Sequence, residues 1–300
     1  MNPHMPQSQP TPKQYDADHV IETFQAAAEE NQLDPLRDQQ VIMLPGEGEL
    51  WIAGDIHDHR TNFRKITAAA DLGNNPQRHL ILQELIHGDH YDDKGREGSW
   101  EMLYRAAELK CDFPNQVHFL FANHDLAQIH GEGIMKAGLS VCEAFTAGVK
   151  RDFADRASSM NVTITEFLLS IPLAARTPSG IFFCHSMPTD EQMDAFDYTI
   201  FERPLNGDDY QRRKGPVYQL IWGRHITPEA SAKFLEHVDA KIVVTGHQPQ
   251  ESGYLVNGDR HLIIASDHNQ GVFLPVDLSK PEYTMDELVE ALTKFVAIDA

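Results

Sequence analysis

The sequence predicts an α/β fold in which several strands end at one common functional edge. Three short apolar runs, at residues 49–53, 78–83 and 116–121, have the length and composition of buried strands. Helical patterns at residues 61–72 and 99–110 separate these runs, which gives three strand–helix units. Each run is followed by side chains that can bind a metal ion. Because open α/β sheets bind ligands at the carboxyl ends of their strands, we expect the functional site there.

The composition limits the classes of function. Of the 300 residues, 41% are hydrophobic, which is enough to bury a sizeable core. The chain has 25 Lys and Arg against 45 Asp and Glu, a net charge of −20, so we expect no nucleic-acid partner. This negative field repels anions, and a bound phosphate therefore needs local cations such as metal ions. The 3 cysteines are odd in number and far apart, which argues against a disulfide framework.

The ends of the chain and its longest apolar runs predict its organisation. Residues 1–15 hold four prolines among polar residues and predict a disordered arm. We expect residues 16–300 to form a single domain with a helical insertion at about 130–176. No run has the length of a membrane span and no secretory signal is visible, so we expect a cytoplasmic protein without a membrane partner. The pattern does not indicate an oligomeric state.

The other elements follow from periodicity and turn residues. Asp16 or Asp18 can cap a helix at residues 16–32, and an apolar segment at 40–44 forms either a hairpin or a sequential strand with 49–53. The remaining predicted elements are, in order, helices at 134–157 and 164–175, a strand at 181–184, a helix at 230–238, strands at 241–245, 254–256 and 261–265, and a helix at 284–296.

Asp55 and His57 form the first candidate metal motif. On an extended backbone, residues two apart point to the same side, so this carboxylate and this imidazole can face one cation. Mixed oxygen and nitrogen ligands are typical of transition metals. Taken alone, the motif is equally compatible with an ordinary strand exit. Its weight comes from the later loops, which repeat the same chemistry: Glu84 or Asp89, then Asn123 and His124, then His185 and His247.

These five loops, in this order, resemble those of the calcineurin-like metallophosphoesterases, most closely the phosphoprotein phosphatase (serine/threonine phosphatase-like) branch. The likeness runs from about residue 50 to about residue 277. It includes segments without ligands, at residues 167–175 and 232–235. His247 stands in Gly246-His247-Gln248, without the second histidine that many metallophosphoesterases carry two residues later, and this feature also indicates the phosphatase branch.

The resemblance implies a four-layer α/β/β/α sandwich with mixed sheets and a dinuclear metal site at the carboxyl ends of the strands. The two divalent or trivalent ions would be Mn, Fe or Zn. They would clamp the phosphoryl group and hold between them the water that attacks phosphorus. The substrate would be a phosphorylated protein or small molecule. Residue by residue, it implies Asp55 and His57 on one metal, Asn123, His185 and His247 on the other, and His124 as the acid that protonates the leaving oxygen.

The second loop departs from the family pattern Gly-Asp-x-x-Asp-Arg-Gly. We place Glu84 at the bridging position because it directly follows an apolar run, whereas Asp89 needs a further loop to return. In this register His87 replaces the Asp that orients the acid, and the phosphate-binding Arg is lost. We assign that role to Arg224, with Arg60 and Arg96 as other candidates.

Alternative functions remain open at the level of sequence. The same fold could serve as a non-catalytic metal- or phosphate-binding module, because the orienting Asp and the gripping Arg are missing. It could also hydrolyse a dinucleoside polyphosphate. A zinc hydrolase acting on acyl bonds is disfavoured, since its sites usually take two or three His from one motif.

Overall fold

The computed structural model describes residues 15–131, 134–136 and 138–298. The predicted N-terminal arm therefore lies, except for Tyr15, outside the described residues. Among the helices in the described ranges, none is both long and apolar enough to cross a membrane.

The first half of the chain builds alternating strands and helices. Its elements are α1 Ala17–Gln32, β1 Arg37–Asp38, β2 Val41–Met43, β3 Glu49–Asp55, α2 Arg60–Ala70, β4 Arg78–Gln83, α3 Trp100–Asp112, β5 Val117–Leu120, α4 Asn123–His130, β6 Met135–Lys136, β7 Leu139–Ser140 and α5 Val141–Phe153.

The second half adds the strands of the larger sheet and their covering helices. Its elements are α6 Ala157–Ser170, β8 Ala174–Arg176, β9 Ile181–Cys184, α7 Asp190–Met193, α8 Pro216–Trp222, α9 Pro228–His237, β10 Ile242–Thr245, β11 Tyr254–Asn257, β12 His261–Ile264, β13 Val272–Asp277, α10 Met285–Ala291 and β14 Thr293–Lys294, with short 3-10 turns η1 Ala154–Arg156, η2 Tyr198–Phe201 and η3 Phe295–Ala297.

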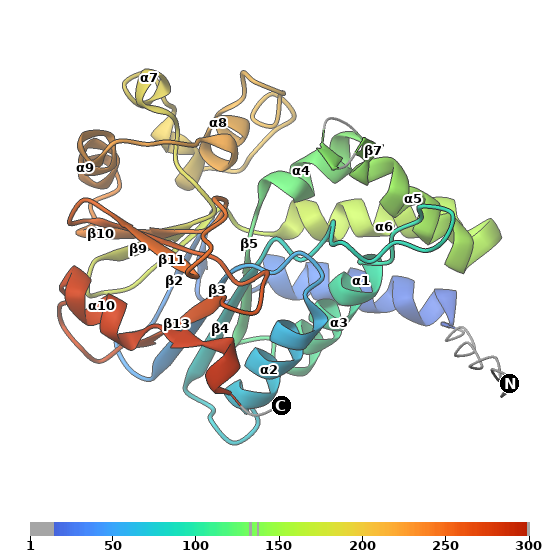
Figure 1. Ribbon diagram of the computed structural model, residues 1–300, viewed down its shortest axis with the longest axis horizontal. Coiled ribbons are helices and arrows are strands. Elements are labelled where there is room, and N and C mark those ends of the chain that lie inside the picture. The colour runs from blue at the N-terminus through green and yellow to red at the C-terminus, as the bar shows by residue number, and fades with distance from the viewer. Residues whose placement is uncertain (1–14, 132–133, 137, 299–300) are drawn as a thin grey trace, which may run out of the picture.

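Two mixed sheets face each other at the centre of the molecule. The larger has the order β1-β2-β8-β9-β10-β12-β11, and the smaller has the order β14-β13-β3-β4-β5. Helices α1, α3, α5 and α6 gather on one side of the molecule, and α7, α8 and α9 lie over β9 and β10 (Figure 1). Together with the two sheets, these helices make the mixed α/β architecture that the resemblance implies.

Alternating residues on each strand pack into different layers. On β4, Leu80 and Leu82 join the helix-covered core, whereas Ile81 joins the core between the sheets. On β9, Phe182 faces the helices and Phe183 faces the other sheet. Successive side chains of a strand point to opposite faces, so strands buried on both faces are near-continuous apolar runs. This is why the apolar runs predicted these strands.

The parallel strands bring their carboxyl ends to one edge. β3 pairs with β4 and β4 with β5, all in parallel, and β9 pairs in parallel with β10 in the other sheet. A parallel bridge between Asp55 and Ala265 joins the two sheets at this edge. The loops that follow these five strands therefore start side by side.

Three predicted elements were wrong in type or extent. The stretch predicted as a helix from residue 134 begins with the β6–β7 hairpin, and α5 starts only at Val141. The helix predicted at 164–175 ends at Ser170, because Ala174–Arg176 pairs as β8 between β2 and β9. The C-terminal helix ends at Ala291, and β14 then pairs with β13. Strands β2 and β3 form no hairpin, since they belong to different sheets.

Candidate metal centre

The first loop turns sharply after β3. Gly54 donates its backbone N–H to Ser266 Oγ at 2.9 Å, and a Cβ at this position would lie 2.2 Å from the carbonyl oxygen of Ile264. Asp55 ends the strand, but His57 is in the left-handed region at φ 44°, so the extended geometry predicted for this pair holds only up to Asp55. The turn places the His57 ring toward the second loop, where its Nδ1 lies 3.0 Å from the Ile86 carbonyl oxygen.

The second loop is joined to the first through its backbone. The carbonyl oxygen of Glu84 accepts the backbone N–H groups of Ile56 (3.1 Å) and His57 (2.8 Å). Glu84 follows β4 directly and has a φ of 47°, a conformation that costs a non-glycine residue about 1 kcal/mol or more. This turn directs a fully buried carboxylate into the edge between the sheets.

The third loop is the amino terminus of α4. Asn123 is the first residue of this helix and His124 the second, and the backbone N–H of His124 donates to Glu84 Oε1 at 3.1 Å. Asp125 caps the helix by accepting the backbone N–H of Ala122 at 2.9 Å. Burial raises the pKa of Asp125 to about 7.

The fourth and fifth loops follow the parallel strands β9 and β10. His185 comes directly after β9, and Gly246 donates its backbone N–H to the His185 carbonyl oxygen at 3.1 Å. A Cβ on Gly246 would lie 2.3 Å from Asp55 Oδ1, so only glycine lets this loop approach Asp55. The backbone N–H of His247 then donates to the same Asp55 oxygen at 2.9 Å.

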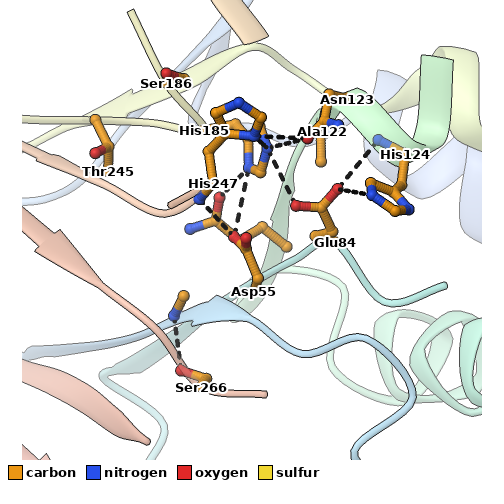
Figure 2. Close-up of polar contacts among 12 residues, drawn as sticks. Asp55, Glu84, Ala122, Asn123, His124, His185, Ser186, Thr245, His247 and Ser266 are labelled. Atoms are coloured by element: carbon orange, nitrogen blue, oxygen red, sulfur yellow. Dashed lines mark hydrogen bonds and ion pairs between the residues drawn. The ribbon is translucent and has the colours of Figure 1, made fainter. Parts of the chain in front are cut away.

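Four ligand atoms from four loops meet at one point (Figure 2). His185 Nε2 lies 2.8 Å from Asn123 Oδ1, 3.2 Å from His247 Nδ1 and 3.2 Å from Glu84 Oε2. His247 Nδ1 is also 2.8 Å from Asn123 Oδ1. A single proton on His185 Nε2 could not serve all three neighbouring acceptor atoms. Lone pairs of these atoms therefore face one another.

A second group shares the carboxylate of Glu84. His57 Nε2 lies 3.9 Å from Glu84 Oε2, and His124 Nε2 lies 3.9 Å from Glu84 Oε1. Within each of two triads, His57–Glu84–His124 and Glu84–His185–His247, the ligand atoms lie within 4.8 Å of one another. Glu84 is thus the one side chain common to both triads.

Hydrogen bonds fix which imidazole nitrogens face the site. The Nδ1 of His185 donates to Gln83 Oε1 at 2.9 Å, because the Gln83 amide nitrogen itself donates to the Ala53 carbonyl oxygen at 3.0 Å. The Nδ1 of His57 likewise donates to the Ile86 carbonyl oxygen. In the neutral rings, both Nε2 atoms therefore present lone pairs to the site, as in metal-binding histidines.

Burial without a counter-charge perturbs two carboxyl groups and two imidazoles of this cluster. Burial raises the pKa values of Asp55 and Glu84, and the charge of Asp55 raises that of Glu84 further. Burial also lowers the pKa of His185 well below its ordinary value and that of His247 to about 3, with Arg224 contributing to both. Without a bound cation, burial thus disfavours the charged forms of both the carboxyl groups and the imidazoles. A bound cation would favour the ionised carboxylates and the neutral imidazoles.

The donor set fits a bound metal ion. Metal–ligand bonds of about 2.0–2.2 Å place neighbouring ligand atoms about 2.8–3.6 Å apart, from octahedral to tetrahedral geometry. The contacts of 2.8–3.2 Å among Asn123, His185, His247 and Glu84 agree with that spacing. Imidazole and oxygen ligands together suit Zn, Fe or Mn.

The other candidate residues lie outside the two triads. Asp89 is exposed in the loop beyond Gly88, whereas Glu84 is buried at the centre. Arg60 pairs with Asp58 and Glu101, and Arg96 pairs with Asp92. Arg224 is exposed and lies near enough to His185 and His247 to shift their pKa values.

Gln83 and Gly246 act in the site but were not identified from the sequence. Gln83 orients His185, and the signal that could have found it is a polar side chain at the end of an otherwise apolar buried strand. Gly246 could have been recognised only from the close approach of Asp55 to its backbone.

With this geometry established, the comparisons with known proteins decide the family. Residues 49–251 match the calcineurin-like phosphoesterase family. The chain belongs to this family. The match spans all five loops that carry the candidate ligands, from the start of β3 to just beyond His247.

Individual relatives agree with this assignment. The chain is 24% identical over 306 residues to a protein of Encephalitozoon cuniculi (strain GB-M1) described as a probable serine/threonine-protein phosphatase. That match covers 92% of this chain but only 61% of the relative, so the chain spans about three fifths of the relative's length.

Solved structures share the fold. A serine/threonine phosphatase from Saccharomyces cerevisiae has a TM-score of 0.64 at 14% identity, covering 88% of this chain and 83% of that one. A cold-active protein-tyrosine phosphatase from a psychrophilic Shewanella species has a TM-score of 0.56 at 15% identity, covering 84% of this chain and 80% of that one. At 14–15% identity these two structures show that the fold is shared, and no more.

Proposed function

We propose that this protein is a metal-dependent phosphoesterase that hydrolyses a phosphate ester in the manner of a protein phosphatase. The observation that carries the proposal is the set of 2.8–3.2 Å contacts among Asn123, His185, His247 and Glu84, in which ligand atoms face ligand atoms. Family membership and the likeness to a probable serine/threonine phosphatase support it.

In this proposal Asn123, His185 and His247 would hold one ion, Asp55 and His57 would hold the other, and Glu84 would serve both. The ions would supply Lewis acidity, which activates water for attack on phosphorus and neutralises charge on the phosphoryl oxygens. Their positive charge would also offset the net charge of −20, which otherwise repels a phosphorylated substrate.

The chain's own residues would bind the phosphate and move the proton. His124 would donate the proton from Nε2 to the leaving oxygen as the phosphorus–oxygen bond breaks and the oxygen keeps the electron pair. Arg224, exposed at the rim, would donate two hydrogen bonds to the phosphoryl oxygens. The substrate would be a phosphorylated protein or a small phosphomonoester.

Metal analysis combined with a substrate panel tests the proposal. The purified chain should contain, or take up, two ions per molecule of Mn, Fe or Zn, and should turn over an aryl phosphate and a phosphoserine peptide. Chelation should abolish turnover, and restoring the metal should recover it. Metal binding without turnover would instead indicate a binding module, and turnover confined to dinucleoside polyphosphates would indicate an anhydride hydrolase.

A further inference from the structure

A chain of hydrogen bonds leads away from His124, on the side opposite Glu84. His87 Nδ1 lies 2.9 Å from His124 Nδ1, and His87 Nε2 lies 2.9 Å from Gln128 Oε1. The amide nitrogen of Gln128 donates in turn to Thr146 Oγ1 at 3.4 Å. The chain thus joins the second loop to α4 and α5.

The directions of these bonds assign the protons. Because the Gln128 amide nitrogen faces Thr146, its oxygen faces His87 and must accept from His87 Nε2. A neutral His87 then has a lone pair on Nδ1, so the hydrogen between the two rings belongs to His124 Nδ1. His124 is thereby held with Nδ1–H directed at His87 and with Nε2 directed toward the site, 3.9 Å from Glu84 Oε1.

His87 is fixed for this task by its surroundings. Its side chain is fully buried and its φ is 63°, a left-handed conformation. Its backbone N–H donates to Ser99 Oγ at 3.0 Å, and its ring makes a T-shaped contact with Phe145, with centroids 5.7 Å apart. A buried histidine held by three segments of chain has little freedom to reorient.

We propose that His87 and Gln128 are positioning residues that set the tautomer and orientation of His124. This inference rests on the proposed function, in which His124 gives its Nε2 proton to the leaving oxygen. When that proton leaves, His124 becomes neutral with Nδ1–H still bonded to His87, so no group in the chain has to move. The partner of the acid is thus a neutral imidazole rather than a carboxylate, which gives orientation without negative charge.

Leaving-group dependence tests the proposal, since protonation of the leaving oxygen matters most when that oxygen is strongly basic. His87→Leu removes the acceptor at similar volume, whereas His87→Asn keeps an acceptor at the position of Nδ1. The matched pair at the next position is Gln128→Leu, which removes the acceptor, and Gln128→Glu, which keeps it.

With the Mn-loaded protein, His87→Leu should lower kcat about 100-fold on an alkyl phosphate but only severalfold on 4-nitrophenyl phosphate. Gln128→Leu should show the same pattern at about tenfold, and His87→Asn and Gln128→Glu should recover most of the loss. The bound metal should stay at the wild-type stoichiometry. An equal loss on both substrates, or loss of one metal ion, would overturn the proposal, the second outcome indicating that His124 is a ligand.

A spectroscopic measurement needs no activity. In ¹⁵N–¹H spectra of the intact chain, His124 should be protonated at Nδ1 in the wild type, and this state should be lost in His87→Leu and kept in His87→Asn. A wild-type His124 without a proton on Nδ1 would overturn the inference. If the wild type turns over no phosphate ester while showing the Nδ1 tautomer, the proposed function fails and the positioning by His87 stands.

Discussion

Strands β4 and β5 carry a buried polar cluster at each end, and the two clusters are built on opposite principles. At the carboxyl ends lies the candidate metal centre. At the amino ends, His79 of β4 and His118 of β5 form a second cluster with Asp34 and Lys110. Both clusters are buried and both contain carboxylates and imidazoles.

The amino-end cluster is complete by itself. Lys110 Nζ donates to Asp34 Oδ2 at 3.0 Å and to the carbonyl oxygens of Pro114 and Val117 at 2.7 and 2.9 Å. His118 Nδ1 lies 2.8 Å from the same Asp34 oxygen, and its Nε2 lies 3.1 Å from His79 Nδ1. Burial raises the pKa of Asp34, but its bond to His118 and the charges of His118 and Lys110 outweigh this and hold it well below the ordinary value.

At the candidate metal centre the same residue types leave one another unsatisfied. Acceptors face acceptors around His185 Nε2, and no Lys or Arg ion pair reaches Asp55 or Glu84 among the residues that the structure describes. A buried network in which every polar group has a partner contributes to the stability of the fold. A buried network of acceptors without a positive charge is instead arranged to bind a cation.

Glu84→Gln should have the largest effect. The change removes the only carboxylate shared by both triads, so we expect loss of bound metal and a fall in turnover of about 1000-fold, equivalent to several kcal/mol. Asp89→Asn is the matched control, because Asp89 is exposed, and should stay within about twofold of the wild type. The opposite ranking in metal analysis would transfer the bridging role to Asp89.

Lys110→Met should destabilise the chain without affecting the metal. It leaves the buried Asp34 carboxylate without its lysine, which should lower the free energy of unfolding by about 3–5 kcal/mol. Lys241→Met breaks an exposed pair with Glu282 and should change it by less than about 1 kcal/mol. Denaturant unfolding measures both, and metal stoichiometry should stay the same. If Lys110→Met lost metal instead, the two clusters would not be independent.

His79→Gln should alter the pH dependence of stability. Burial, then the charge of His118, lowers the pKa of His79 to about 4, whereas the unfolded value is about 6.5. The unfolded chain therefore binds this proton first, and the wild type should lose up to about 3 kcal/mol as pH falls from 6.5 to 4. The variant should lack this part of the loss. His19→Gln, on the exposed face of α1, is the control and should follow the wild-type curve.

Arg224→Ala should have the smallest effect. A bidentate bond to phosphate contributes about 1.5–3 kcal/mol, so kcat/KM on a phosphomonoester should fall about 10- to 100-fold with metal content unchanged. Arg64→Ala, an exposed arginine on α2, serves as the control. An unchanged kcat/KM for Arg224→Ala would remove Arg224 from substrate binding.

Much of the fold could be predicted because strands buried on both faces are near-continuous apolar runs. That rule identified β3, β4, β5, β9 and β10, whose ends carry the candidate ligands. It failed for β8, whose alanines favour a helix but pair between β2 and β9. It also failed for β13, which was not predicted as a strand and contains Pro275, a residue that is locally unfavourable in a sheet. In both strands, pairing with distant segments overrode local preference.

The site residues that could be identified from the sequence lie in the loops that follow predicted strands. Asp55, Glu84, Asn123, His185 and His247 each follow a predicted strand, and the structure brings them together. Gln83 and Gln128 escaped notice because their partners, His185 and His87, lie 102 and 41 residues away along the chain. No local pattern encodes such contacts. The assignment of roles to these residues stays a prediction that the substitutions above can test.

The left-handed backbone at the site has a consequence for engineering. Four residues of the site have positive φ angles: His57 (44°), Glu84 (47°), His87 (63°) and His247 (68°). At each position glycine would relieve about 1 kcal/mol of backbone strain. Selection of a variant library for thermal stability alone should therefore enrich glycine at these four positions. The enriched variants should be more stable but should no longer turn over substrate. Selection for thermal tolerance in this chain must be coupled to a screen for turnover.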